Sequence, residues 1–199
     1  MNSSESTRVQ TSTSVPSLKR SVIVGGIGFC MASLFVFATV AFAERWMYTR
    51  LGWIGAYAVW TALFILLGGG ALAVLIARPM SVAKFYAVFS AAFFAYAVGW
   101  VGAYYALRDG AGEWLGSLAG SVLMGLVIAA GFKVMRSALV FSVVLFAANS
   151  VGYFVGLLLN NRIRGEAGML LWGASFGLAL GAGLGAVLHL AQTRRGEGS

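Results

Sequence analysis

Residues 167–190 read AGMLLWGASFGLALGAGLGAVLHL and contain no lysine, arginine, aspartate or glutamate. A helix needs about 20 predominantly apolar residues to cross the hydrocarbon core of a bilayer. Within this stretch Gly173, Gly177, Gly181 and Gly185 recur at every fourth position, so they fall on one face of a helix. The stretch therefore predicts a membrane-spanning helix with one face of small residues.

Five earlier stretches have the same uncharged, apolar character. A transmembrane β-strand would be about half as long and would alternate polar with apolar residues, which these stretches do not. Together they predict an all-α, six-helix transmembrane bundle with short loops. The predicted spans are residues 21–43, 51–77, 85–107, 114–132, 138–159 and 167–190.

The composition of the whole chain agrees with this class of protein. Of its 199 residues, 60% are hydrophobic and 10% are charged, whereas a soluble domain carries about 25% charged residues. We expect residues 1–20 to form a disordered, Ser/Thr-rich cytoplasmic tail. Residues 21–192 are then the six-helix transmembrane domain, and residues 193–199 a short cytoplasmic tail.

The basic residues predict the orientation, because lysine and arginine accumulate in cytoplasmic segments. With the N-terminus inside, nine of the 14 basic residues lie on the cytoplasmic side, and four of the six acids lie outside. This distribution accounts for the whole net charge of +8. We therefore expect the basic residues to face a lipid bilayer, and we expect no nucleic-acid partner. The prediction is a cytoplasmic-membrane protein with both termini inside. The inner basic residues are Arg8, Lys19, Arg20, Arg78, Lys84, Lys133, Arg136, Arg194 and Arg195.

Tryptophans near the predicted outer ends of the helices support this orientation, since such rings settle at the headgroup level. They are Trp46, Trp53, Trp100, Trp114 and Trp172.

The first span has a second interpretation. Lys19 and Arg20, the apolar run and Ala41-Phe42-Ala43 resemble a secretory signal with a small-x-small cleavage site. The run exceeds the usual 7–15 apolar residues, which favours a retained helix. Cleavage would leave five spans and an outer N-terminus.

The glycines predict close helix packing. Helices in lipid associate through small-xxx-small faces that let their backbones approach. Two interpretations stay open for the last helix: packing within the chain, or a homo- or hetero-oligomer. Residues 68–70, three consecutive glycines, predict either a kink or a packing notch. The predicted packing residues are Gly116, Gly120, Gly152, Gly156, Gly173, Gly177, Gly181 and Gly185.

The second half of the chain echoes its middle, which suggests duplicated helical hairpins. Apolar composition also produces such matches by chance, so coincidence is the alternative. Residues 88–90 (VFS), 94–95 (FA) and 98–100 (VGW) match residues 140–142 (VFS), 146–147 (FA) and 151–153 (VGY).

Asn149 is the main polar candidate inside the predicted membrane region. An amide buried without a hydrogen-bond partner costs several kcal/mol, and helical spacing places Asn149 on one face with Ser142. With Tyr57, Tyr96 and Tyr153 it would form a weakly polar site. This site is either a structural contact between helices or a contact for a substrate or ion.

Catalysis is not expected. A metal site needs several His, Cys or carboxylate ligands together, and the chain has one histidine, His189, and one cysteine, Cys30. No base accompanies a nucleophile within the spans. The prediction is therefore no enzyme, no metal and no cofactor.

Two functions remain. The leading hypothesis is a non-catalytic membrane subunit or scaffold that acts through glycine-rich helix packing. The alternative is a small-solute transporter or channel-like protein with a weakly polar intramembrane pocket. A continuous cavity lined by Asn149, Tyr96 and Tyr153 would favour transport, and a closed core would favour the scaffold.

Overall fold

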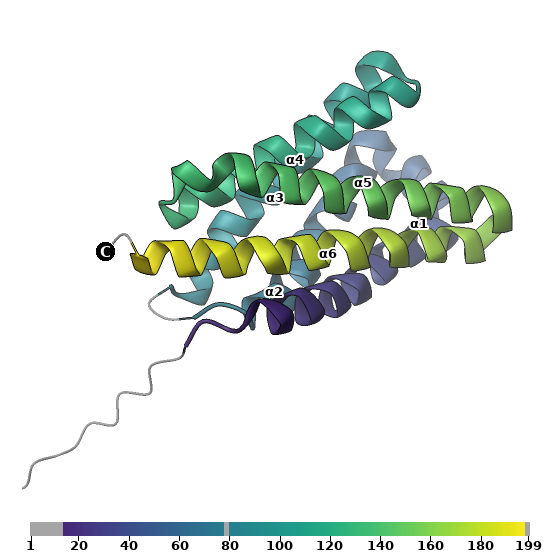
Figure 1. Ribbon diagram of the computed structural model, residues 1–199. Helices are drawn as coiled ribbons and strands as arrows, with labels where there is room; N and C mark the ends of the chain where they lie inside the picture. Colours follow the sequence, from purple (N-terminus) through teal and green to yellow (C-terminus); the bar gives the residue numbers. More distant parts are fainter. Residues whose placement is uncertain (1–13, 78–79, 198–199) are drawn as a thin grey trace, which may run out of the picture.

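The computed structural model describes residues 14–77 and 80–197, and in this part of the chain it contains helices and no strand (Figure 1). Residues 1–13 of the predicted tail and Arg78 lie outside the described residues. The elements are α1 (Leu18–Leu63), the π-helical turn η1 (Phe64–Gly68), α2 (Gly69–Ala73), α3 (Val82–Leu107), α4 (Gly110–Phe132), the short 3-10 turn η2 (Met135–Ser137), α5 (Ala138–Ile163) and α6 (Gly165–Glu197).

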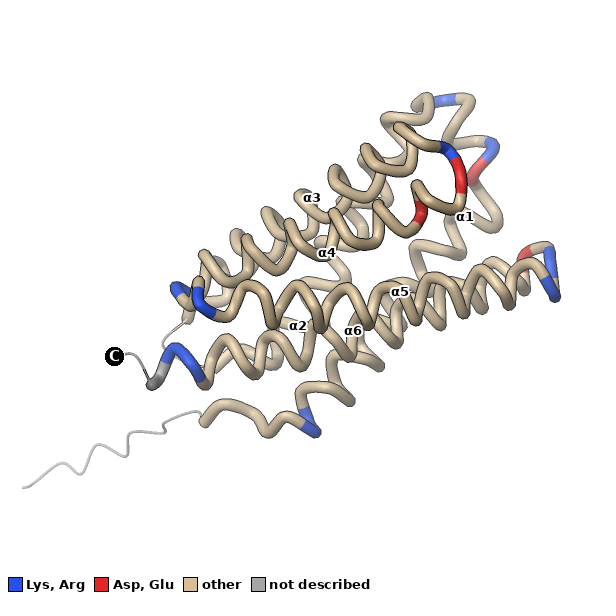
Figure 2. Tube along the Cα trace, turned by 45° about the horizontal axis from the view of Figure 1, so that its top comes forward, with Lys and Arg blue, Asp and Glu red and all other residues tan. Residues whose placement is uncertain are grey.

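Within the described residues, five continuous helical stretches are long and apolar enough to cross a membrane. The lysines, arginines, aspartates and glutamates of the described residues gather at the two ends of the bundle, and the middle carries none (Figure 2). Large apolar side chains such as Phe42 and Leu139 point outward, with 70% and 75% of their surface exposed. An outer surface of this kind suits a lipid environment and would be costly in water.

The first helical stretch reverses direction at Gly52. This glycine has φ 67° and ψ 175°, a backbone conformation that essentially only glycine adopts. Beyond it the chain returns along its own first half: the Trp60 indole donates to the Thr39 hydroxyl at 3.1 Å, and the rings of Phe29 and Phe64 stack at 5.7 Å. The expectation that residues 44–50, between the predicted spans 21–43 and 51–77, form a short loop is therefore wrong. Those residues are helical, because hydropathy marks where lipid ends and not where a helix ends.

The helices also extend beyond the predicted spans at the other end of the bundle. α1 begins at Leu18, inside the predicted tail, and α6 continues to Glu197 through residues 193–197. The Thr193 hydroxyl donates to the His189 carbonyl at 3.1 Å, as expected within a helix. The Pro16 carbonyl lies 2.8 Å from His189 Nδ1, so the start of α1 and the end of α6 meet.

The glycine face of α6 packs against α1 of the same chain. Gly173, Gly177, Gly181 and Gly185 are all buried, and a methyl group at any of them would collide with α1. At Gly177 the obstacle is the Ser33 side chain, whose hydroxyl donates to the Gly173 carbonyl at 2.7 Å. The glycine stripe thus lets the backbones of α1 and α6 approach each other closely.

Each of the other predicted packing glycines faces the helix that precedes or follows its own helix in the sequence. A methyl group at Gly116 or Gly120 of α4 would contact Trp100 or Tyr96 of α3. On α5, Gly152 and Gly156 lie against Phe176 and Trp172 of α6.

The glycines at 68–70 form a packing notch beside a widened helical turn. A methyl group on Gly68 would lie 2.5 Å from the Phe29 ring, and one on Gly69 would lie 2.8 Å from the Tyr86 ring. The π-helical turn η1 ends at Gly68, and its Leu66 carbonyl accepts a hydrogen bond from the Tyr86 hydroxyl at 3.2 Å. Of the two alternatives predicted for this segment, the contacts of Gly68 and Gly69 agree with the packing notch, and the backbone at these two residues stays helical.

Gln192 of α6 ties down the chain beyond α2. Its side-chain oxygen accepts from the Ala77 amide at 2.7 Å, and its amide nitrogen donates to the Leu75 carbonyl at 3.1 Å. These are backbone groups that the end of a helix leaves without partners. The sequence did not single out Gln192.

Candidate functional site: an aromatic cavity

A cavity of about 330 Å³ lies between both arms of α1 and the helices α3, α5 and α6. Eleven of its eighteen lining residues are aromatic. The cavity thus presents mainly ring surfaces to whatever enters it. The aromatic lining residues are Phe37, Tyr48, Tyr57, Trp60, Phe64, Phe93, Tyr96, Trp100, Tyr153, Trp172 and Phe176.

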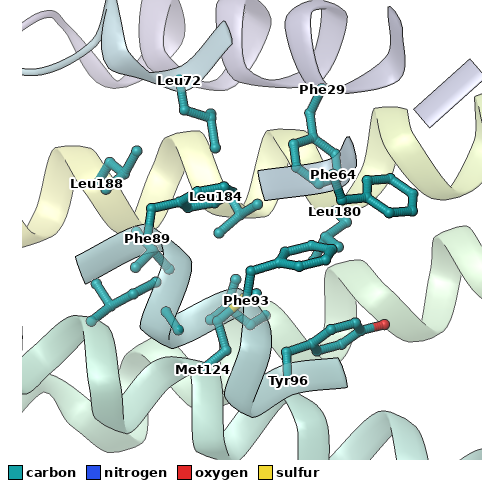
Figure 3. Packing of buried hydrophobic residues seen from close by; sticks show 14 of the residues in the cluster. Phe29, Phe64, Leu72, Phe89, Phe93, Tyr96, Met124, Leu180, Leu184 and Leu188 are labelled. Atoms are coloured by element: carbon teal, nitrogen blue, oxygen red, sulfur yellow. The ribbon is translucent and has the colours of Figure 1, made fainter. Parts of the chain in front are cut away.

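A stack of phenylalanines closes the cavity in the middle of the bundle. Phe64 and Phe93 line it, with ring centroids 5.2 Å apart, and Phe29 packs behind them at 5.7 Å from Phe64 and 6.1 Å from Phe93. Figure 3 shows these rings together, with Leu180 and Leu184 of α6 beside them. Phe29, Leu180 and Leu184 are fully buried, so packed side chains block the bundle at this level.

A second, more polar cavity of about 490 Å³ adjoins the first at the turn between α5 and α6. Both cavities are lined by Val40, Glu44 and Met169. We call this second cavity the vestibule. Its remaining wall comes from Ala41, Asn160, Asn161, Arg164, Gly165 and Glu166.

Asn149 belongs to a closed hydrogen-bond network beside the aromatic cavity. Its side-chain oxygen accepts from the Tyr96 hydroxyl at 2.7 Å, and its nitrogen donates to the Ser117 hydroxyl at 2.7 Å. Ser117 and Ser150 share a further hydrogen bond at 2.8 Å. Asn149 and Ser117 are fully buried, and Asn149 does not line either cavity. The network joins α3, α4 and α5, as a structural contact between helices would.

The structure separates the five predicted polar residues. Tyr57, Tyr96 and Tyr153 line the aromatic cavity, whereas Asn149 reaches it only through Tyr96. Ser142 donates to the Ala138 carbonyl of its own helix at 2.9 Å and is not part of the site. The Tyr153 hydroxyl donates to the Glu113 carboxylate at 3.2 Å.

The tryptophans fall into two groups that sequence reasoning did not separate. Trp46, Trp53 and Trp114 are 61%, 53% and 51% exposed, as an aromatic belt requires. Trp100 and Trp172 instead form part of the cavity wall. One signal was present: glycines on the neighbouring helices, Gly116 and Gly156, leave room for two indole rings to turn inward.

The cavity wall carries one carboxylate, that of Glu44, and the described residues that line it include no lysine or arginine. Tyr48 lies close by, and its partial burial, followed by the Glu44 charge, raises the pKa of its phenol. Tyr48 therefore stays neutral at physiological pH. Among the described residues no group of three His, Cys, Asp or Glu is placed to hold a metal ion. The site is suited to binding through ring surfaces.

No family model, no curated protein and no solved structure matches this chain.

Proposed function

We propose that this chain is a multi-pass protein of the cytoplasmic membrane that binds a small, largely apolar solute in its aromatic cavity, as a transporter or channel-like protein does. One observation carries the proposal: a ring-lined cavity extends from the exposed Glu44 to the packed rings of Phe64 and Phe93. Of the lining expected for a transporter it has Tyr96 and Tyr153 but not Asn149, so the support is for binding of a solute and not for a continuous path through the bundle. Ligand pockets are typically concave, mostly apolar and furnished with a few polar groups. Covering the aromatic side chains with an apolar ligand would remove their surface from water, which is favourable.

We further propose six membrane crossings. The stretch from Leu18 to Ala73 has 56 residues, and at 1.5 Å per residue it would be roughly 84 Å long as one straight helix, far more than a bilayer core of about 30 Å. The reversal at Gly52 divides it into two arms, each of suitable length for one crossing.

The placement of both termini in the cytoplasm is part of the same proposal. The contact between Pro16 and His189 puts the start of α1 and the end of α6 on one side. Lys19 and Arg194 lie within five residues of this contact in the sequence. The acidic residues coloured in Figure 2 gather at the opposite end of the bundle, where some basic residues lie as well. The positive-inside rule then assigns the first side to the cytoplasm.

The proposed hairpin duplication has support in equivalent contacts. Gly99 of α3 packs on Gly120 of α4, and its sequence match Gly152 of α5 packs on Phe176 of α6. The matched residues Trp100 and Tyr153 both line the cavity, with ring centroids 5.5 Å apart.

The scaffold hypothesis remains a prediction. It was based on the glycine stripes, the expected lack of a soluble domain and the absence of titratable residues within the spans. Of the stripes, that of the last helix is covered by α1 of the same chain. Proteins that co-purify with the chain from native membranes in mild detergent would support the scaffold. Purification of a monomer alone would count against it.

Filling the cavity tests the binding proposal. Ala97 lines the cavity, whereas Ala91 lies on the exposed face of the same helix. The neutral, environment-sensitive dye N-phenyl-1-naphthylamine should bind the wild-type protein in nanodiscs above the level of empty nanodiscs. Ala97→Phe should weaken that binding at least tenfold, and Ala91→Phe should leave it within twofold. Equal binding by the wild type and Ala97→Phe, or no binding above empty nanodiscs, would refute the proposal.

A further inference from the structure

Three of the polar side chains that line the aromatic cavity are engaged in hydrogen bonds, and the hydroxyls of Tyr48, Tyr57 and Thr61 complete its polar lining. The Tyr96 hydroxyl donates to Asn149, the Tyr153 hydroxyl to Glu113, and the Trp60 indole to Thr39. A ligand that needs hydrogen-bond donors, such as an anion or a sugar, would find few of them. Eleven of the eighteen lining residues are aromatic, so ring faces and charge make up most of what a ligand would contact.

The two remaining indole N–H groups do not change this conclusion. Those of Trp100 and Trp172 are buried and have no hydrogen-bond partner. A nitrogen that pointed into a cavity large enough for water would be accessible, so both point away from it. The five-membered edges of the two rings lie against Gly116 and Gly156. Each tryptophan consequently offers carbon surface to the cavity.

The faces of aromatic rings carry negative partial charge and attract cations, most strongly when the cation is desolvated. The charged group that lines the cavity and the one hydrogen-bonded to its wall are both carboxylates. Glu44 lines it, and Glu113 lies directly behind the wall, where it accepts the hydrogen bond from Tyr153. A Tyr153 hydroxyl that donates to a carboxylate leaves its own oxygen more negative.

The vestibule wall also has more negative than positive charges. It holds two carboxylates, Glu44 and Glu166, and one guanidinium, Arg164. The vestibule wall therefore carries one net negative charge, which favours a cation over an anion at this position.

We infer that the cavity selects hydrophobic monocations, in which an apolar body carries a quaternary ammonium or phosphonium centre, over anions of the same size and shape. This inference rests on the proposed function, since it names the class of solute for the same cavity. The rings enclose the apolar body and stabilise its charge, while Glu44 at the mouth sets the sign of the charge admitted.

Tetraphenylphosphonium and tetraphenylborate test the inference, because they have nearly the same shape and opposite charge. Each is titrated separately against the full-length protein in nanodiscs of uncharged lipid, and binding is followed by quenching of tryptophan fluorescence. Ala97→Phe, which keeps all the tryptophans, corrects for partition into lipid. We expect tetraphenylphosphonium to bind at least tenfold more tightly than tetraphenylborate. Equal affinities, or tighter binding of the borate, would overturn the inference.

Two pairs of variants locate the selectivity. Glu44→Gln should weaken tetraphenylphosphonium binding about fivefold, the factor for a unit charge about 4 Å away in a water-like medium, whereas Glu44→Asp should stay within twofold. Tyr57→Leu should weaken it about tenfold and Tyr57→Phe should not, because only the ring is needed. An unchanged affinity in both Glu44→Gln and Tyr57→Leu would refute the inference.

The neutral dye separates this inference from the function on which it rests. If N-phenyl-1-naphthylamine binds in the cavity while the phosphonium shows no preference over the borate, the charge selectivity is wrong and the binding function stands. If neither the dye nor the phosphonium binds above the Ala97→Phe level, both proposals fail.

Discussion

At the scale of single residues, Asn149 connects three helices through one amide. It accepts from Tyr96 of α3 and donates to Ser117 of α4. The sequence indicates Asn149 and Tyr96, because an amide within an apolar stretch must find partners. It does not indicate Ser117 or Ser150 as those partners, since many serines and tyrosines lie at similar depth and only helix packing selects among them.

Replacing Asn149 with leucine, which has a similar volume, should destabilise the protein by about 1–3 kcal/mol, because Tyr96 and Ser117 then lose a buried partner. Thermal unfolding of the purified variant in detergent would show a lower Tm. Asn161→Ala is the matched control, since Asn161 is exposed and its Tm should equal that of the wild type. An unchanged Tm for Asn149→Leu would contradict a structural role for the network.

Gly52 is a second residue that can be tested alone, because its contribution to stability comes from its backbone conformation and not from contacts. No atom lies within 4 Å of the position that a methyl group would take, so Gly52→Ala introduces no clash. Its φ of 67° is nevertheless unfavourable for alanine, and we expect a loss of about 1–3 kcal/mol of stability from the backbone alone.

Gly102→Ala serves as the control for Gly52→Ala. Gly102 also has open space around it, but it lies within α3, where alanine is favoured over glycine by up to about 1 kcal/mol. The Tm should fall for Gly52→Ala and stay level or rise for Gly102→Ala. Parallel shifts in the two variants would show that the turn at Gly52 carries no backbone strain.

At the scale of elements, the contact between α1 and α6 depends on the absence of side chains along one stripe. Gly181 and Gly185 bring the α6 backbone against Gly25 and Ser21 of α1. Helix association in lipid relies on such close approach because lipid tails are as apolar as the side chains. The two helices that carry the chain termini are held together in this way.

Gly177→Leu should therefore disrupt the contact between α1 and α6. The new side chain would enter the space of Ser33 and the backbone of Cys30, and overpacking of this kind costs about 1–3 kcal/mol or more. A lower Tm and a broader gel-filtration peak in detergent are the expected results. Gly102→Leu, on the exposed face of α3, should change neither. A Gly177→Leu protein as stable and as well associated as the wild type would refute this account of the stripe.

At the scale of the whole molecule, the charges at the two ends and the reversal at Gly52 define the proposed topology. Green fluorescent protein fused to the C-terminus should fluoresce, since it does so in the cytoplasm. Alkaline phosphatase inserted after Asp109 should be active and the same enzyme at the C-terminus inactive. The reverse pattern would contradict cytoplasmic termini.

A separate experiment decides whether the first span is retained or cleaved. An epitope tag placed before residue 14 should remain on the membrane-inserted protein if the first helix is retained. Loss of the tag with the appearance of a shorter protein would show cleavage after Ala43, leaving five crossings and an outer N-terminus.

The sequence by itself determined the helical class, the uncharged spans, their charged ends and the glycine faces, because hydropathy and helical periodicity are properties of neighbouring residues. It also indicated Tyr57, Tyr96 and Tyr153 as inward-facing. The tertiary structure alone decided which helix packs against the α6 glycines, since the backbone of any other helix could pack closely against a row of glycines.

The cavity likewise depends on tertiary structure, because its walls combine residues from Val36 to Phe176 that lie far apart in the sequence. An aromatic residue near the end of an apolar span fits a headgroup belt, a packed core or a cavity wall equally well. The physical distinction between Trp53 and Trp172 lies in the opposing helix: α5 presents Gly156 to Trp172, and Trp53 is left largely exposed.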